Sequence, residues 1–335
     1  MAEATLAAVS GRARTRLYVA LAAVVSAALV VGITLLQSGD GAQPRAPEPP
    51  RVQAPPLELG ILLRSDREAR RLRAAERAFD GGRRADALRR FEALLQSDPD
   101  SVEAAVGVAV ATWPDGTLTR LRALVAEHPS SGVARLHLGL TLAAGGSEAA
   151  AAREWNEVER RDPDSPAALR AEDLLHPDMA PGRPPFVARF ERPAGLDGLS
   201  PEKQLDRLRE RARAGGPTEW LLLGTAYQRV GLPVSAERAF ARAADLAPDD
   251  LAALTAAAVG RFSKDDPAAT FSRLGPLTDR PGAAVVRYHL GLCLSWLGAV
   301  AEAREQLRLA RRSSPGGFYG REARRLLDRL EAVGS

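Results

Sequence analysis

The stretch that decides the fold is residues 217–250, PTEWLLLGTAYQRVGLPVSAERAFARAADLAPDD. It holds two amphipathic helical patterns, which are separated by the turn sequence GLP at 231–233. In the first pattern, residues that share one helix face recur three or four positions apart: Trp220, Leu223, Gly224 and Tyr227. Ala236, Phe240 and Ala243 do the same in the second, and Pro248 ends that helix. The stretch therefore predicts a hairpin of two packed helices.

The spacing Trp-x2-Leu-Gly-x2-Tyr, Ala-x3-Phe-x2-Ala and a final Pro fills 34 residues and resembles the tetratricopeptide repeat. Gly224 and Ala236 are small where the paired helices must approach most closely, and the aromatic residues fill the space around them. A single hairpin of this kind cannot bury its apolar face, so further copies are expected on both sides. The resemblance implies an all-α fold, a tetratricopeptide-repeat α-solenoid of helix-turn-helix hairpins.

Further copies of the pattern occur on both sides, in the order strong, weak, strong and then a closing helix. In the first half they are residues 68–101, 102–131 and 132–165, with a closing helix at 166–175. In the second half they are residues 217–250, 251–283 and 284–317, with a terminal helix at 318–333. A Pro-rich and Gly-rich connection, 176–199, separates the halves, and FVARF at 186–190 within it is compatible with an extended strand over a helix surface.

The two halves match each other more closely than the repeat pattern requires. VARLHLGLTL at 133–142 aligns with VVRYHLGLCL at 285–294, at an offset of 152 positions (133 to 285). Pro129 and Pro281 keep that offset, as do Pro163 and Pro315. We interpret this as two blocks of three repeats that arose by duplication; convergence on a shared repeat pattern is the alternative.

The beginning of the chain has the pattern of a membrane anchor. Residues 17–36 carry no charge and would span about 30 Å as a helix. Arg12, Arg14 and Arg16 precede them, which predicts an N-terminus in the cytoplasm and everything after Leu36 outside. A cleaved signal peptide is the alternative, although its apolar region is normally about 7–15 residues long and residues 37–42 offer only a poor cleavage site.

Six prolines between residues 43 and 56 predict a semi-rigid extended spacer, with plain disorder as the alternative. The predicted organisation is a cytoplasmic tail (1–16), a transmembrane helix (17–36), a Pro-rich linker (37–56), a first repeat block (57–175), a connection (176–199) and a second block with a capping helix (200–335). Ser200 and Pro201 are typical of the first turn of a helix.

Composition and motifs argue against an enzyme and against a nucleic-acid partner. The net charge is +4, of which the first sixteen residues contribute +2, so the remainder is nearly neutral. The four histidines form no HxxxH or HExxH spacing, and there is no GxSxG, P-loop or GxGxxG after a strand. Cys293 is the only cysteine and lies in an apolar helical pattern, so it predicts a buried, inert thiol. No catalytic residue, metal site or cofactor is predicted.

His137 and His289 occupy the same place in the two halves, beside the glycine at the helix crossing. This equivalence favours a structural role, such as a hydrogen bond between helices.

The resemblance implies a binding face. In similar proteins the first helices of the repeats line a concave groove that holds a peptide or a partner's helix. Carried over by repeat position, the groove residues are Leu72, Glu76, Phe79, Leu136, Leu140, Leu221, Thr225, Gln228, Arg229, Tyr288, Leu292 and Trp296. The Lys and Asn residues with which one subset of the family binds a terminal carboxylate are absent from these positions. Packing of these side chains against a neighbouring repeat or against 176–199 is the alternative.

The function implied is a membrane-anchored scaffold or adaptor for protein–protein interactions on the extracytoplasmic side of a bacterial membrane. Anchored repeat proteins of this kind include assembly and maturation factors. A secreted soluble binding protein is the alternative if the N-terminal segment is cleaved. An enzyme with a cryptic site would need a polar cluster in the groove.

Overall fold

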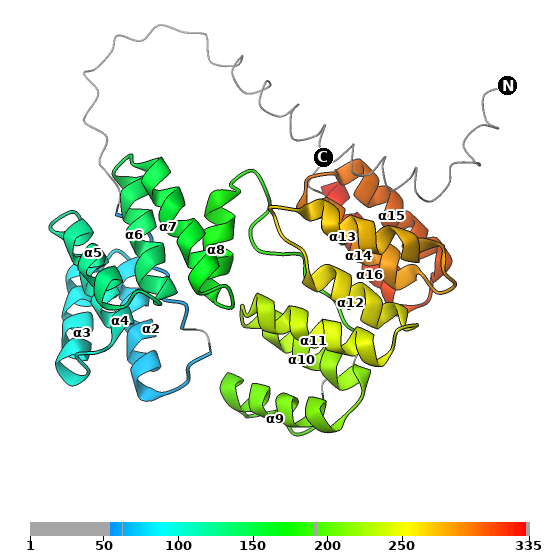
Figure 1. Cartoon of the computed structure of the whole chain (residues 1–335), viewed down its shortest axis with the longest axis horizontal. Helices are drawn as coiled ribbons and strands as arrows, with labels where there is room; N and C mark the ends of the chain where they lie inside the picture. Colours follow the sequence, from blue (N-terminus) through cyan, green and yellow to red (C-terminus); the bar gives the residue numbers. More distant parts are fainter. Residues whose placement is uncertain (1–53, 62, 190–192, 333–335) are drawn as a thin grey trace, which may run out of the picture.

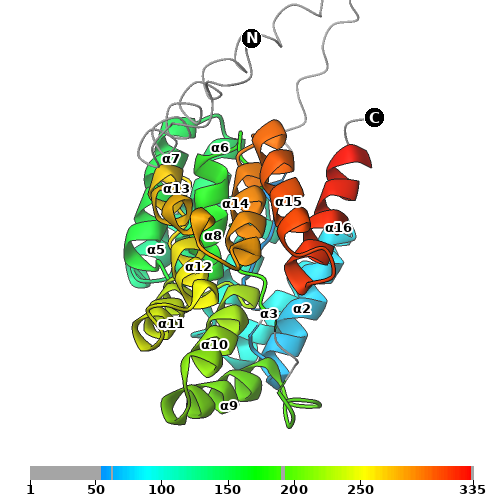
Figure 2. The same cartoon turned by 90° about the vertical axis from the view of Figure 1, so that its right-hand side faces the viewer.

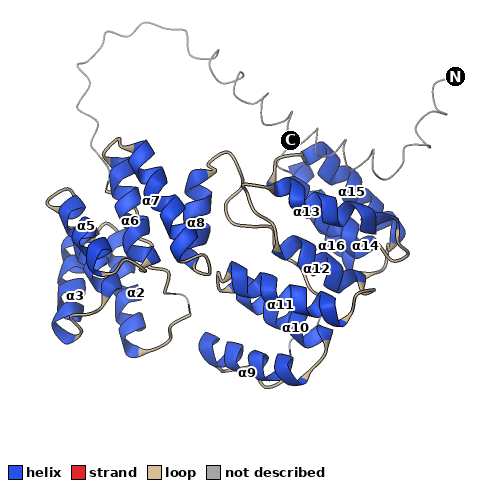
Figure 3. Cartoon of the chain, viewed as in Figure 1, coloured by secondary structure: helices blue, strands red, loops and turns tan. Residues whose placement is uncertain are grey.

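The computed structural model describes residues 54–61, 63–189 and 193–332. Every regular element in these ranges is a helix (Figure 3). The predicted tail (1–16), the predicted membrane span (17–36) and nearly all of the predicted linker (37–56) lie outside them. Within the described ranges, no helix is both long enough and apolar enough to cross a membrane.

The helices follow one another as antiparallel neighbours in two blocks, which lie side by side in Figure 1. The first block contains α2 (Arg67–Asp80), α3 (Arg84–Ser97), α4 (Val102–Ala111), α5 (Thr117–Glu127), α6 (Gly132–Ala144), α7 (Glu148–Arg161) and α8 (Pro166–Leu175). The second contains α9 (Pro201–Ala214), α10 (Pro217–Arg229), α11 (Pro233–Leu246), α12 (Leu251–Gly260), α13 (Pro267–Leu274), the 3-10 helix η1 (Gly275–Asp279), α14 (Ala284–Trp296), α15 (Val300–Ser313) and α16 (Phe318–Ala332). The predicted all-α repeat solenoid is confirmed.

Each block is three hairpins and a closing helix. The hairpins are α2–α3, α4–α5 and α6–α7 in the first block, and α10–α11, α12–α13 and α14–α15 in the second, where α9 packs on α10. Figure 2 looks along the second block, with α14, α15 and α16 side by side. The equivalent helices α6 and α14 begin 152 positions apart, as do α7 and α15 and the closing helices α8 and α16.

Local sequence explains where many of these helices begin. Within the described ranges, side-chain oxygens accept a hydrogen bond from the first turn of their helix at Asp66, Ser131, Ser165, Ser200, Asp250 and Asp266. Proline occupies the first turn of α8, α9, α10, α11 and α13, where its missing N–H has no helical partner to lose. The predicted cap at Ser200 is confirmed, since its oxygen accepts from the backbone N of Lys203.

Glycines mark the closest helix crossings. A Cβ on Gly224 of α10 would lie 2.4 Å from Cε1 of Phe240 on α11, and a Cβ on Gly139 of α6 would lie 2.3 Å from Nε1 of Trp155 on α7. Both distances are far below van der Waals contact. The family spacing therefore reflects a physical requirement, a bare backbone against an aromatic ring.

Each block has its own core. Phe91, Leu121 and Val158 lie at 0% exposure within the first, and Phe240, Ala256 and Leu274 within the second. A smaller cluster joins α14, α15 and α16. Because no apolar core cluster of the described residues combines side chains of α2–α8 with side chains of α9–α16, each block is stabilised mainly from within.

The junction between the blocks is largely polar. Asp164, in the turn before α8, accepts hydrogen bonds from the backbone N (3.0 Å) and Oγ (2.5 Å) of Ser235 in the first turn of α11. The carboxylate thus supplies negative charge to the amino end of a helix in the other block. Nζ of Lys264, a fully buried side chain, lies 2.5 Å from Oδ1 of Asp173 on α8. Burial of these charges is tolerated because each has a partner of opposite sign or a hydrogen bond.

We expect Gly224→Leu to reduce the free energy of unfolding by about 1–3 kcal/mol or more, because the new side chain must displace the Phe240 ring. Denaturant unfolding followed by circular dichroism measures it. Gly316→Leu is the matched control: this exposed glycine has no atom within 4 Å of an added Cβ, and its stability should change little. Equal effects of the two substitutions would mean that the helix crossing does not require glycine.

Candidate functional site

The first-helix face of each block is covered by an extended segment of the same chain. Residues 57–61, here called the N-terminal strap, lie on the first block. Residues 183–189, called the central strap, lie on the second. In this structure the chain itself therefore covers the first-helix faces on which the binding groove was predicted.

The N-terminal strap is held by its backbone amides and its alternate side chains. The N–H of Glu58 donates to Nε2 of His137 on α6 (3.0 Å), and the N–H of Leu59 donates to Oε1 of Glu76 on α2 (3.0 Å). Leu57, Leu59 and Ile61 are 3–5% exposed and belong to the core of the first block. Successive amides of an extended chain point to opposite sides, so α2 and α6 hold the strap between them.

The carboxyl end of the N-terminal strap is fixed to α2. Arg73 donates from Nη1 to the carbonyl oxygens of Ile61 (3.0 Å) and Arg64 (2.8 Å). Glu76 binds Leu59, and Arg73, which comes earlier on α2, binds Ile61, which comes later in the strap. The strap therefore runs antiparallel to α2.

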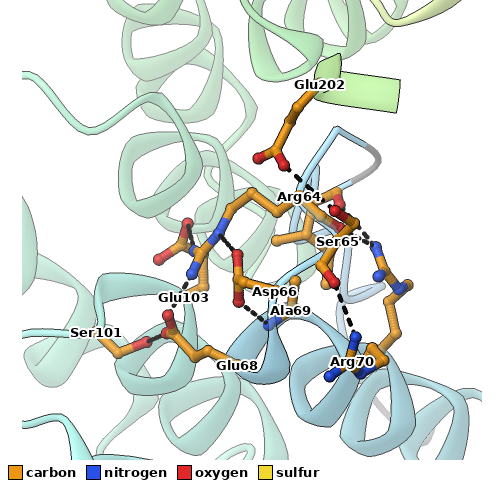
Figure 4. Close-up of polar contacts among 11 residues, drawn as sticks. Arg64, Ser65, Asp66, Glu68, Ala69, Arg70, Ser101, Glu103 and Glu202 are labelled. Carbon is orange, nitrogen blue, oxygen red and sulfur yellow. Dashed lines mark hydrogen bonds and ion pairs between the residues drawn. The ribbon is translucent and has the colours of Figure 1, made fainter. Parts of the chain in front are cut away.

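Arg64 is the centre of the polar network beyond the strap (Figure 4). Its guanidinium contacts the carboxylates of Asp66 and Glu68 at the start of α2 and that of Glu103 on α4. Three carboxylates around one guanidinium, each partly shielded from water, fix the turn into α2.

The same close-up shows Glu202 of α9 pointing at Ser65, whose Oγ donates to Oε2 at 3.2 Å. The second block therefore also contacts the turn that follows the N-terminal strap.

The central strap uses the same two kinds of acceptor. The N–H of Phe186 donates to Oε1 of Gln228 on α10 (3.1 Å), and the N–H of Val187 donates to Nε2 of His289 on α14 (2.9 Å). The Phe186 ring stacks on the His289 ring, with centroids 4.8 Å apart. Tyr319 Oη donates to the Val187 carbonyl (3.2 Å), so the closing helix α16 also holds the strap.

The central strap runs in the same direction as the N-terminal one. Trp296, at the carboxyl end of α14, donates from Nε1 to the Gly182 carbonyl (3.1 Å), and His289, earlier on α14, accepts from Val187. The chain thus moves toward the amino end of α14, antiparallel to it. Both straps lie antiparallel to the first helices and are held by a histidine and by Glu76 or Gln228.

The two histidines have identical roles. Nδ1 of His137 lies 2.7 Å from the Val133 carbonyl and Nδ1 of His289 lies 2.8 Å from the Val285 carbonyl, one turn earlier on the same helix. With the proton on Nδ1, the neutral ring presents Nε2 as an acceptor to the strap amide. Burial lowers the pKa of both rings to about 4, so the neutral form persists at physiological pH.

The histidine prediction needs one correction. A structural hydrogen bond was expected at His137 and His289, and the bond exists, but it joins a helix to an extended strap and not to another helix. Neither ring has a nitrogen left for a second helix, because Nδ1 is used within the ring's own helix and Nε2 accepts from the strap.

Cavities lie beside both straps. One of about 530 Å³ borders the N-terminal strap and is lined by α2, α4, α6 and α8, including Arg73, Glu103 and Arg170. The other, about 580 Å³, lies between the central strap, α9 and α10, and its lining is mostly apolar, including Leu205, Leu208 and Leu222. These spaces show that the straps do not fill the grooves completely.

The predicted groove residues fall into three groups. Glu76, Gln228 and Trp296 hydrogen-bond to the segments that cover the grooves or lead into them. Buried among the apolar clusters are Leu72, Leu136, Leu140, Leu221, Tyr288 and Leu292. Partly buried or exposed are Phe79, Thr225 and Arg229. Thr225 and Arg229 line the larger cavity. Binding of a partner protein by these residues stays a prediction.

Burial shifts the pKa of two further side chains. Burial, with the nearby charges of Glu172 and Asp265, raises the pKa of Glu159 to about 7 at the junction of the blocks. Burial also raises the pKa of Cys293 to about 12, and the predicted burial of this thiol is confirmed. Within residues 54–61, 63–189 and 193–332, no group of three or more His, Cys, Asp or Glu side chains could hold a metal ion.

The tetratricopeptide repeat family model matches residues 72–120 and 114–166. These ranges run from within α2 to the start of α8, so the first block carries tetratricopeptide repeats, as the sequence spacing predicts. No curated protein sequence matches this chain.

Several solved structures are similar to this chain. A thermophilic tetratricopeptide repeat protein of Thermus thermophilus, TTC0263, has 20% identity over 58% of this chain and 98% of its own, with a TM-score of 0.29. A chain of the Cut9–Hcn1 hetero-tetramer of APC/C has 16% identity over 80% of this chain and 50% of its own (TM-score 0.32). The tetratricopeptide repeat domain of P58(IPK) has 16% identity over 79% and 78% (TM-score 0.27). This chain thus covers nearly all of the first and half of the second.

The buried histidines predict a pH dependence of stability. Their pKa is near 6.5 in the unfolded chain and about 4 in the folded one, so the unfolded state binds protons first as the pH falls. As the pH falls from about 6.5 to 4, each histidine therefore lowers the free energy of unfolding by a total of about 3 kcal/mol. His289→Gln keeps an acceptor without titration. Its free energy of unfolding should fall less than that of the unmodified chain between pH 7.5 and 4.5; parallel pH profiles would exclude a neutral, buried His289.

Proposed function

We propose that this chain is a membrane-tethered scaffold that recruits other proteins on the extracytoplasmic side of a bacterial membrane. One observation carries the recruiting role: both first-helix faces have acceptors that hold an extended backbone through its amides, at His137 and Glu76 and at His289 and Gln228. A surface that binds its own extended segment in this way has the chemistry to bind one from another protein.

The tether rests on the sequence. Residues 17–36 form an uncharged stretch of bilayer length, and Arg12, Arg14 and Arg16 precede it. The prolines of residues 43–56 then act as a spacer between the membrane and the repeats. Tethering confines the scaffold to one surface, which favours recruitment into an envelope assembly.

A reporter enzyme that is active only outside the cytoplasm tests the topology when it is fused after Ser335. The fusion should be active, and the protein should sediment with membranes until detergent is added, because residues 17–36 are retained. A new N-terminus near Ala42, found by mass spectrometry in a soluble active fusion, would leave export intact but replace the scaffold on the membrane with a secreted binding protein.

Photo-crosslinking in the cell tests recruitment. A photoreactive residue at Arg229, which is exposed and lines the larger cavity, should give discrete protein adducts. The same residue at Arg312, exposed at the end of α15, is the control and should give none of them. Identical adducts from both positions, or none from Arg229, would contradict recruitment through the first-helix face of the second block.

A further inference from the structure

The two straps differ in how they are joined to the fold. The central strap connects α8 to α9, so both of its ends lead to described helices. The N-terminal strap precedes α2. Displacing the central strap would require the connection between α8 and α9 to move while both helices stay in place.

The side chains of the central strap are part of the core. Phe186 is 2% exposed, stacks on His289 and makes an edge contact with Phe240, whose ring centroid is 5.5 Å away. Phe240 is also the ring against which Gly224 packs. Removing Phe186 would open a cavity beside Phe240, at the centre of the repeat at 217–250. The central strap is therefore anchored by an aromatic side chain within the core of the second block.

The N-terminal strap makes contacts that another peptide can reproduce. Its two central amides meet side-chain acceptors, and its apolar side chains stand at alternate positions, 57, 59 and 61. Between them, the Glu58 carboxylate lies 2.9 Å from Nε of Arg170 on α8, and both side chains are about one-third exposed. The adjoining cavity of about 530 Å³ leaves room beside the strap.

We infer that the groove of the first block is an exchangeable peptide receptor, that residues 57–61 are its built-in competitor, and that a partner protein displaces them with an extended segment carrying apolar side chains at alternate positions and a carboxylate between them. This inference rests on the proposed scaffold function and adds to it a peptide-binding groove in the first block. The segment runs antiparallel to α2, as the strap does, and has no proline at its two central positions, because the amides there bond to His137 and Glu76.

The effective concentration of the N-terminal strap sets how strongly it competes with a free peptide for the groove. A strap joined to its groove through a few residues acts as a ligand at an effective concentration on the order of millimolar. A free segment with the same contacts must therefore exceed that concentration, or make additional contacts in the adjoining cavity. Weakening the strap lowers this threshold without changing the groove.

The test uses the full chain in detergent and a fluorescent peptide with the sequence of residues 54–61, APPLELGI. Leu57→Ser/Leu59→Ser weakens the strap by removing two buried apolar side chains. Fluorescence anisotropy should show that this variant binds the peptide at least tenfold more tightly than the unmodified chain does. The peptide with its residues in reverse order, and the peptide N-methylated at the Glu58 and Leu59 amides, should each bind at least tenfold more weakly.

A charge reversal identifies the groove. Adding Arg170→Glu to the strap variant should weaken the APPLELGI peptide roughly threefold to tenfold, since the ion pair is partly exposed. A peptide with Arg in place of its Glu should then recover the loss. Recovery places the peptide in the first groove; insensitivity to both changes places it elsewhere and overturns the inference, as does equal binding of the N-methylated peptide.

Hydrogen exchange on the unmodified chain covers the case in which the strap variant does not fold. Millimolar peptide should accelerate exchange of the Glu58 and Leu59 amides, and leave the Phe186 and Val187 amides of the central strap unchanged. No acceleration would make the N-terminal strap a fixed structural element. A concentration-dependent dimer that exchanges straps would make a second copy the occupant and overturn the partner assignment. Adducts from Arg229 with no peptide binding would leave the scaffold function intact and refute only this receptor.

Discussion

The covering of each block's first helices depends on a hydrogen bond from a strap amide to a fully buried histidine, made once in each block. A three-repeat block leaves an apolar face on its first helices, and an extended segment can cover that face only if its own amides find acceptors. Helices offer no free backbone acceptor in their middle turns. His137 and His289 supply one, because the carbonyl one turn earlier binds Nδ1 and leaves Nε2 free to accept. This contact lets the rest of each strap lie along the first helices.

Polar contacts join the two short blocks into one molecule. A solenoid of six uninterrupted repeats would share one continuous core, but here the closing helix α8 ends the first stack. The blocks then meet through charged and polar groups: Asp164 at the amino end of α11, Lys264 with Asp173, and Glu202 with Ser65. Such contacts need good geometry to offset desolvation, and they fix orientation more than they add stability. Most of the apolar contribution stays within each block, together with its strap.

Sequence reasoning could predict the parts whose signal is local. The spacing of Gly224 and Phe240 fixes a helix crossing because both residues lie within one hairpin. The partner of His137 could not be predicted in this way, because Glu58 lies 79 positions away and the bond goes to a backbone amide, which leaves no trace in residue type. The alternation of residues 57–61 covers only five positions, too few to separate a strand from the start of a helix. Trp296 was predicted to face the groove; in the structure its indole Nε1 donates to the carbonyl of Gly182, in the connection between the blocks.

Coverage by the chain itself couples stability to recognition. The side chains that make the N-terminal strap stabilising, at 57, 59 and 61, are those that any competing segment must replace. Each additional buried methylene in the strap therefore raises both the stability of the first block and the threshold for a partner, by about 0.8 kcal/mol. The Glu58–Arg170 pair acts differently: being one-third exposed, it adds little stability but excludes a segment with a positive charge at that position. In the proposed receptor, affinity would thus be set by apolar contacts shared with folding, and selectivity by a charge that adds little to folding stability.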